Sequence, residues 1–224
     1  AFQDSCWERN ILIFDLGGGS LDVGVATIDD GVVDIKAVAG NDRLGGFDFD
    51  SFLVDHLLSK LRVRYCIDIS HNAKSVRQLY EACERAKVND YTGVSFNEIL
   101  PTQSNWEEEV EQCEVRELLS EVFYHCEEVI HRVLEEAETS SDEIHEVFLL
   151  GGCGEMFEIQ ELIESILDES EVNQCNDEDS SCAVTGAAVQ AAILGKKDNI
   201  EALSSLFSPP LCCFSIYIEY DSSV

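Results

Sequence analysis

Residues 11–25, ILIFDLGGGSLDVGV, decide the fold. Two apolar runs flank three consecutive glycines, with Asp15 before them and Asp22 after them. Apolar runs broken by glycine predict two strands joined by a tight hairpin. Glycines at the tip let backbone N–H groups approach a ligand, because no Cβ intervenes, and successive N–H groups can hold an anion. A plain turn with incidental aspartates is an equal alternative from these residues alone.

The composition of the chain limits the kinds of partner that it can bind. The chain has 224 residues, 45% of them hydrophobic, which is enough for the core of one domain or of two tightly joined ones. It has 45 acidic and 14 basic residues, which gives a formal net charge of −31. A surface this acidic repels phosphate backbones and anionic lipids, so we expect neither nucleic acid nor membrane as a partner. It also disfavours a free anionic nucleotide unless a cation such as Mg²⁺ accompanies it.

The cysteines and histidines do not form a metal-binding pattern. None of the ten cysteines belongs to a C-x-x-C motif, and the five histidines show no ligand spacing with them. We therefore expect no zinc site. No signal-like segment opens the chain, and no apolar stretch approaches the length of a membrane span. These features predict reduced thiols and a cytoplasmic protein.

The periodicity of the remaining sequence predicts an α/β fold. Strands are expected at 11–14, 21–28, 32–38, 147–150 and 214–220, with short β-like segments between 91 and 111. Helices are expected at about 49–60, 73–88, 115–137, 159–167 and 184–194, and loops at 39–46 and 171–181. This order predicts a layered α/β domain with an inserted α+β portion.

A second glycine turn occurs at 148–154, FLLGGCG, between a strand and a helix. Ligands of open α/β sheets bind at the carboxyl ends of strands, so we expect this turn to meet the first one at a shared cleft. A tight entry into the helix is the alternative interpretation.

Five segments resemble the nucleotide-binding domain of the 70-kDa heat-shock chaperones, in the actin and sugar-kinase ATPase superfamily. They are IFDLGGGSLDV (13–23), AGNDRLGGFDFD (39–50), ACERAK (82–87), LLGGCGEMFEIQEL (149–162) and GAAVQAAIL (186–194). The resemblance covers roughly residues 10–200. It implies the second lobe of that domain: an actin-like ATPase (ribonuclease H-like) lobe with a mixed sheet, flanking helices and an inserted α+β subdomain. The implied divisions are a lobe core at 1–40 and 118–200, an outer subdomain at 41–117, and a linker with the start of a strand at 201–224.

The resemblance implies a site for ATP or ADP with Mg²⁺ at the first glycine turn. Catalytic roles are implied for Asp15, Ser20 and Asp22, and the two aspartates would also hold the metal through water. The residues around the β- and γ-phosphates would be Gly17, Gly18 and Gly19.

The nucleoside side of the implied site is less complete. Glu84 and Lys87 would contact the nucleoside, and Gly151 and Gly152 would form the turn on its adenosine side. Two arginines form the walls around adenine in the family, but this chain has Val88 and Glu155 at those positions. Stacking of a guanidinium on a π face contributes on the order of 1 kcal/mol. The absence of both arginines therefore predicts about a tenfold to a few hundredfold loss of nucleotide affinity.

Two functions are compatible with these residues. The first is an ATP-dependent protein-folding chaperone, whose partners would be unfolded client proteins and co-chaperones. The alternative is a catalytically inactive scaffold or co-chaperone-like interaction protein that retains the lobe. The family's first lobe, with its own phosphate loop, is not matched, so the chain is divergent or truncated. We expect ATP hydrolysis only where a first lobe is present, and none from the isolated chain.

Overall fold

A computed structural model describes residues 8–29, 32–88, 94–95, 107–108, 112–154, 156–167, 170–174, 186–188 and 191. Its central sheet has five strands in the order β3 (Val32–Asn41), β2 (Leu21–Asp29), β1 (Arg9–Leu16), β6 (Ile144–Leu150) and β7 (Glu171–Gln174).

The sheet is mixed because its strands are connected in two ways. Strands β1, β2 and β3 follow one another closely in the sequence and pair antiparallel. Strand β6 pairs parallel with β1, and β7 pairs parallel with β6. Between β6 and β7 the chain crosses over through helix α5 (Phe157–Ile166), as a parallel connection requires. The predicted α/β class, a mixed sheet with flanking helices, is confirmed.

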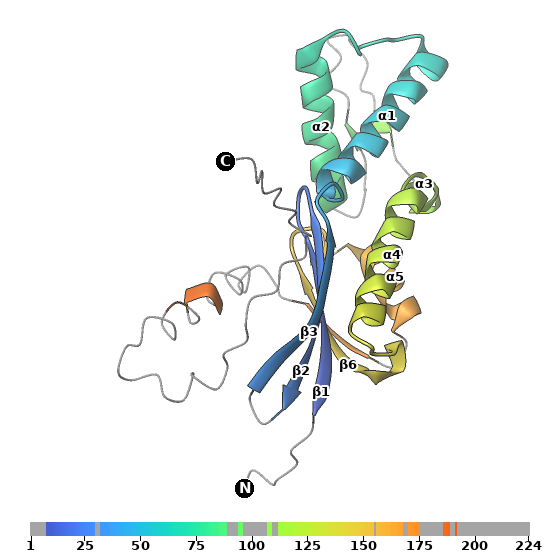
Figure 1. The fold of residues 1–224 in the computed structure, drawn as a ribbon. Coiled ribbons are helices and arrows are strands. Elements are labelled where there is room, and N and C mark those ends of the chain that lie inside the picture. The colour runs from blue at the N-terminus through green and yellow to red at the C-terminus, as the bar shows by residue number, and fades with distance from the viewer. Residues whose placement is uncertain are drawn as a thin grey trace, which may run out of the picture.

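Helix α4 (Ser120–Glu136) packs on β2 and β3, and α5 packs on α4. In Figure 1 both helices lie along one side of the sheet. Apolar residues of α4 recur with the helical period and are buried, and the guanidinium of Arg132 also donates to the carbonyl of Gly40 at 2.8 Å. The helix is thus fixed against the end of β3.

The inserted part contains α1 (Gly46–Tyr65), α2 (Ala73–Val88), a short antiparallel pair, β4 (Val94–Ser95) and β5 (Glu107–Glu108), and α3 (Gln112–Leu118). Figure 1 shows α1 and α2 beyond the tip of the β1–β2 hairpin. Helix α1 begins at Gly46, where the Asp48 carboxylate accepts the N–H of Gly45 at 2.9 Å and caps the first turn. The domain boundaries expected at 41 and 117 stay predictions.

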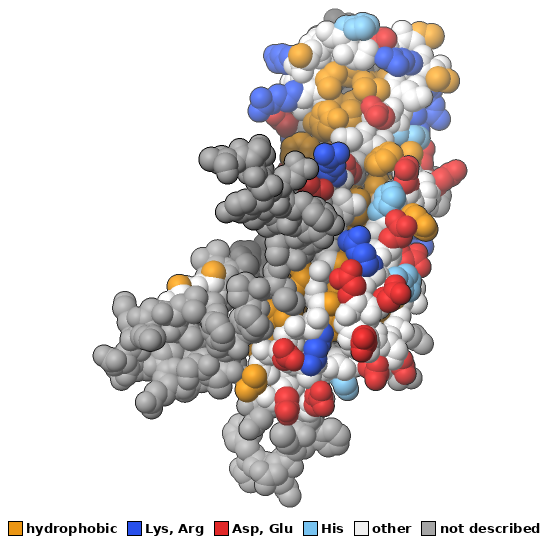
Figure 2. Space-filling view, viewed as in Figure 1, with side chains coloured by type: hydrophobic (Ala, Val, Ile, Leu, Met, Phe, Trp, Pro, Cys, Tyr) orange, Lys and Arg blue, Asp and Glu red, His pale blue; other side chains and the backbone are white. Residues whose placement is uncertain are grey.

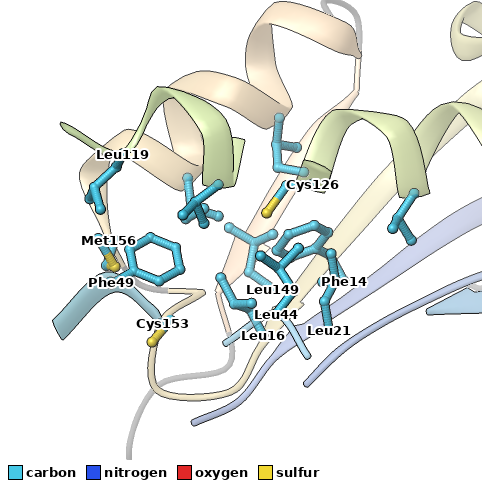
Figure 3. Close-up of a cluster of buried hydrophobic side chains, with 14 of the residues drawn as sticks. Phe14, Leu16, Leu21, Leu44, Phe49, Leu119, Cys126, Leu149, Cys153 and Met156 are labelled. Carbon is cyan, nitrogen blue, oxygen red and sulfur yellow. The ribbon is translucent and has the colours of Figure 1, made fainter. Parts of the chain in front are cut away.

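Core side chains converge directly beneath the two glycine turns. Figure 3 shows part of this core, where residues of the strands, α1, α4 and the loops pack together. The labelled members are Phe14, Leu16, Leu21, Leu44, Phe49, Leu119, Cys126, Leu149, Cys153 and Met156. Phe14, Leu16 and Leu21 are completely buried. The glycine tip therefore stands on a close-packed base, which fixes its position.

Three sequence-based expectations were wrong in detail. The loop expected at 171–181 contains β7 at its start, because pairing with β6 holds this polar segment at the sheet edge. The first residues of the loop expected at 39–46 belong to β3, which ends at Asn41. The single helix expected at 115–137 is two helices, since Leu119 (ψ 5°) interrupts the regular backbone.

Some expected elements fall outside the described residues. This holds for the strand at 214–220 and for most of the helix at 184–194, of which residues 186–188 and 191 are helical. Within the described part of the chain, none of the helices has the length and apolar character needed to cross a bilayer.

Candidate functional site

The glycine tip of the β1–β2 hairpin is held by its carbonyl groups. Inside the hairpin, the N–H of Gly17 donates to the carbonyl of Ser20 at 3.0 Å. The carbonyls of Gly17 and Gly18 accept the N–H groups of Gly46 (3.0 Å) and Phe47 (2.8 Å), in the first turn of α1. The tip and the start of α1 are therefore one rigid unit.

The amides at the tip are available to a ligand. Among the described residues, the N–H groups of Gly18 and Gly19 donate no backbone hydrogen bond. A Cβ placed on either glycine would meet nothing within 4 Å, so no side chain fills the space beside the tip. Two such N–H groups beside open space can receive an anion.

The second glycine turn lies against the end of β1. Gly151 has a left-handed backbone (φ +78°), and a Cβ there would lie 2.3 Å from the carbonyl oxygen of Leu16 and 2.7 Å from a carboxylate oxygen of Asp15. The N–H of Cys153 donates to the same Leu16 carbonyl at 3.2 Å. Only glycine permits this approach, which brings the two turns side by side.

Asp15 and Asp22 are opposite each other in the register of β1 and β2. Burial raises the pKa of Asp15, and the charge of Asp22 raises it further. Two neighbouring carboxylates attract a cation, and Mg²⁺ in such sites keeps several of its waters. Within the described residues, no group of three or more His, Cys, Asp or Glu side chains is arranged to hold a metal directly. The pair therefore suits a hydrated cation.

A cleft of about 820 Å³ is lined by residues of the tip, the second turn, α1 and α2. This volume is typical of sites for small molecules. Its lining includes five of the predicted residues: Gly17, Gly18, Glu84, Lys87 and Gly152.

The other predicted residues border the tip rather than line the cleft. They are Asp15, Gly19, Ser20, Asp22 and Gly151. A groove of about 930 Å³ between β3 and α4 contains none of the predicted residues.

Lys87 and Asp50 form an ion pair at the base of the cleft. The Lys87 ammonium donates to the Asp50 carboxylate at 2.9 Å and to the carbonyl of Gly46 at 3.1 Å. Burial raises the pKa of Asp50, although the Lys87 charge acts in the opposite direction. Sequence reasoning assigned no role to Asp50, whose only signal is an aspartate among the apolar positions of a predicted helix.

Sequence reasoning also missed the aromatic residues of the cleft, Phe47 and Tyr80. Cys153, in the second turn, is 4% exposed, and burial raises the pKa of its thiol. Of the two residues that replace the family's arginines, Val88 is the last residue of α2, and Glu155 lies outside the described residues.

Comparison with known proteins agrees with this geometry. The family model described as Hsp70 protein matches residues 2–220. The chain is 34% identical to a heat shock 70 kDa protein of Neurospora crassa and 35% identical to heat shock cognate 70 kDa protein 3 of Dictyostelium discoideum, over 95% of its length in both cases. It is 35% identical to a ribosome-associated molecular chaperone of Nakaseomyces delphensis over 84% of its length.

The chain spans about a third of the length of these relatives: 33%, 34% and 31%, respectively. The matched region includes both glycine turns, the two aspartates and the helices that form the cleft. By the extent of this match, the chain belongs to the Hsp70 protein family, and its fold is that of an actin-like ATPase lobe.

Proposed function

We propose that the chain is the second lobe of an ATP-binding chaperone ATPase and that ATP or ADP binds with Mg²⁺ in the cleft. The observation that carries this proposal is the glycine tip. Its Gly18 and Gly19 amides have no backbone partner among the described residues, a Cβ on either glycine would meet nothing within 4 Å, and Gly18 lines a cleft of ligand size. Membership of the Hsp70 family supports it.

The residues around the tip have the chemistry that a magnesium nucleotide needs. In this proposal Gly17, Gly18 and Gly19 surround the β- and γ-phosphates, with the Ser20 hydroxyl as a further polar group. Asp15 and Asp22 hold the metal through water, and their combined negative charge favours the cation over the free nucleotide. The metal, when bound, offsets the negative charge of the phosphates.

The nucleoside end of the cleft is assigned to α2 and the second turn. Glu84 and Lys87 are three residues apart on α2, so both side chains reach the same end of the cleft. Gly152 also lines the cleft, and a Cβ there would meet nothing within 4 Å. Gly151 acts indirectly, since its close approach to Leu16 sets the position of the second turn.

The activity of the whole protein is proposed by family membership. The relatives carry the names heat shock 70 kDa protein and ribosome-associated molecular chaperone. We propose that the protein to which this lobe belongs is an ATP-dependent folding chaperone of the cytoplasm, with unfolded proteins and co-chaperones as partners. Hydrolysis would use Asp15 and Asp22 to orient the attacking water.

Calorimetric titration of the chain with Mg-ATP tests the nucleotide site. We expect the Gly18→Val variant to lose binding by at least about tenfold, because the valine side chain fills the open space beside the tip. We expect the Asp15→Asn variant to bind Mg-ATP more weakly and to depend less on Mg²⁺, because one of the two carboxylates that attract the cation is lost.

The matched control is Gly24→Val, in β2 of the same hairpin, where a Cβ would make only ordinary contacts of 3.8 Å or longer. It should bind Mg-ATP as the wild type does. If the wild type releases no heat with millimolar Mg-ATP, the nucleotide proposal is wrong for this chain and the scaffold alternative stands.

A further inference from the structure

The outer wall of the cleft is aromatic and exposed. Phe47, in the first turn of α1, is 70% exposed and lines the cleft together with Val76 and Tyr80 of α2. Figure 2 shows hydrophobic side chains gathered over α1 and α2, whereas acidic side chains dominate the surface around α4. A large aromatic ring exposed inside a cleft of ligand size is a contact surface for an apolar group of the ligand.

The aromatic wall is rigidly connected to the glycine tip. The N–H of Phe47 donates to the carbonyl of Gly18 at 2.8 Å. One helical turn later, the hydroxyl of Ser51 donates to the carbonyl of Phe47 at 2.8 Å, and the hydroxyl of Tyr80 donates to Ser51 Oγ at 3.3 Å. Gly18 and the exposed ring of Phe47 are therefore neighbours, held in a fixed relation on the lining of one cleft.

We infer that Phe47 is the stacking surface for the base of the bound nucleoside triphosphate and sets the affinity for its nucleoside part. This inference rests on the proposed function. A nucleotide has anionic phosphates and a flat, weakly polar ring, and the cleft lining contains both the glycine tip, whose Gly18 amide has no backbone partner among the described residues, and an exposed aromatic face. Aromatic side chains stack on bases without reading their edges.

Calorimetric titration with two ligands, Mg-ATP and Mg-tripolyphosphate, isolates the base, because the second ligand has the phosphates alone. We expect Phe47→Ala to weaken Mg-ATP binding about tenfold, which corresponds to about 1.4 kcal/mol. Its affinity for Mg-tripolyphosphate should stay within about twofold of the wild type, since the ring does not contact the phosphates. Phe47→Tyr keeps the ring and should restore Mg-ATP binding.

The matched control is Val63→Ala, which truncates a side chain that is 82% exposed on the same helix and outside the cleft. It should bind both ligands as the wild type does. Thermal unfolding of each variant verifies the fold, and removal of an exposed ring should leave the midpoint unchanged.

The outcomes separate this inference from the proposed function. If Phe47→Ala changes the affinities for both ligands equally, or changes neither, Phe47 is not a base-stacking residue, although the phosphate site stands. The same conclusion follows if the wild type binds Mg-ATP and Mg-tripolyphosphate with equal affinity. If the wild type binds neither ligand, the proposed function fails and the inference fails with it.

Discussion

The ammonium of Lys87 lies 2.9 Å from the carboxylate of Asp50, and the two side chains are only 10% and 11% exposed. The pair connects α2 to α1 at the base of the cleft. Its position suits two tasks, since Lys87 presents positive charge to the cleft while Asp50 compensates that charge in the absence of a ligand. A buried ion pair of this kind contributes little net stability when intact but is costly when one partner is removed.

We predict that Lys87→Met lowers the free energy of unfolding by about 3 kcal/mol, because it leaves the Asp50 carboxylate buried without its partner. Adding Asp50→Leu to this variant should recover most of the loss, since no buried charge then remains. Urea denaturation of the single and double variants measures both effects.

The control for this pair is Lys36→Met, which breaks a more exposed ion pair with Asp34. Its effect on the free energy of unfolding should be much smaller than that of Lys87→Met, because solvent screens the pair. A Lys87→Met variant as stable as the wild type would show that the pair does not hold α1 and α2 together.

The pKa of Asp15 predicts a pH dependence. Burial and the charge of Asp22 raise this pKa in the folded state, so the folded chain binds the proton more tightly than the unfolded chain does. The contribution of Asp15 to stability is therefore fully present below its ordinary pKa of 3.8 and is lost as the pH rises through the folded-state value.

We expect Asp22→Asn to lower the pKa of Asp15 and to reduce this loss of stability, because one of its two causes is removed. NMR titration of the Asp15 carboxyl carbon and urea denaturation across this pH range measure the change. Asp42→Asn, in the exposed loop after β3, serves as a control that should leave the Asp15 titration unaltered. An unchanged Asp15 titration in Asp22→Asn would contradict the coupling of the two carboxylates.

Substitution by alanine should affect stability very differently at two adjacent glycines. Gly151→Ala should destabilise the fold by about 2 kcal/mol or more, because the left-handed backbone disfavours a Cβ and the Leu16 carbonyl lies 2.3 Å from its position. Gly152→Ala should change stability by no more than about 0.5 kcal/mol, since its Cβ has open space. Thermal and urea denaturation of the pair provide the measurement, and equal effects at the two positions would disprove the close approach of the second turn to β1.

The described cysteines should differ in their reaction with iodoacetamide. Cys66 is exposed, whereas Cys83 and Cys126 are buried and burial raises their pKa values to about 12. Because the thiolate is the reactive form, we expect Cys66 to be alkylated at least about 100-fold faster than either of them in the folded protein. Mass spectrometry of a time course gives the rates. In urea the difference in alkylation rate should largely disappear. Rapid labelling of Cys126 in the folded protein would contradict its burial in the core.

The sequence predicted most of the elements because each carries a local signal. Apolar runs identified β1, β2 and β3, and helical periodicity identified α2 with its bounds at Ala73–Val88. The break at Leu119 had no such signal. Backbone hydrogen bonds from Leu119 to Val115 (2.9 Å) and from Phe123 to Leu119 (2.9 Å) continue across it, so the apolar stripe runs on through the interruption. A four-residue polar strand such as β7 also has no local sequence signal, since it forms by pairing with β6.

The candidate site was predictable where it is made of backbone. The glycine triplet, the flanking aspartates and the second turn were all found from the sequence, since the need for glycine is a local property of the chain. The ion pair of Lys87 with Asp50 was not predictable, because the two residues are 37 positions apart and meet only when α1 packs on α2. The exposure of Phe47, which precedes the helix expected at about 49–60, was not predictable either, since a large aromatic residue is normally buried.

The sequence by itself determined the family, the hairpin with its glycine tip, and the acidic charge that disfavours a nucleotide without an accompanying cation. Only the tertiary structure decided which groups share the cleft, which carboxylates interact and which ring stays exposed. The physical reason is that backbone preferences act between neighbours in the chain. Burial, ion pairing and cleft shape instead depend on distances between segments that the sequence places far apart.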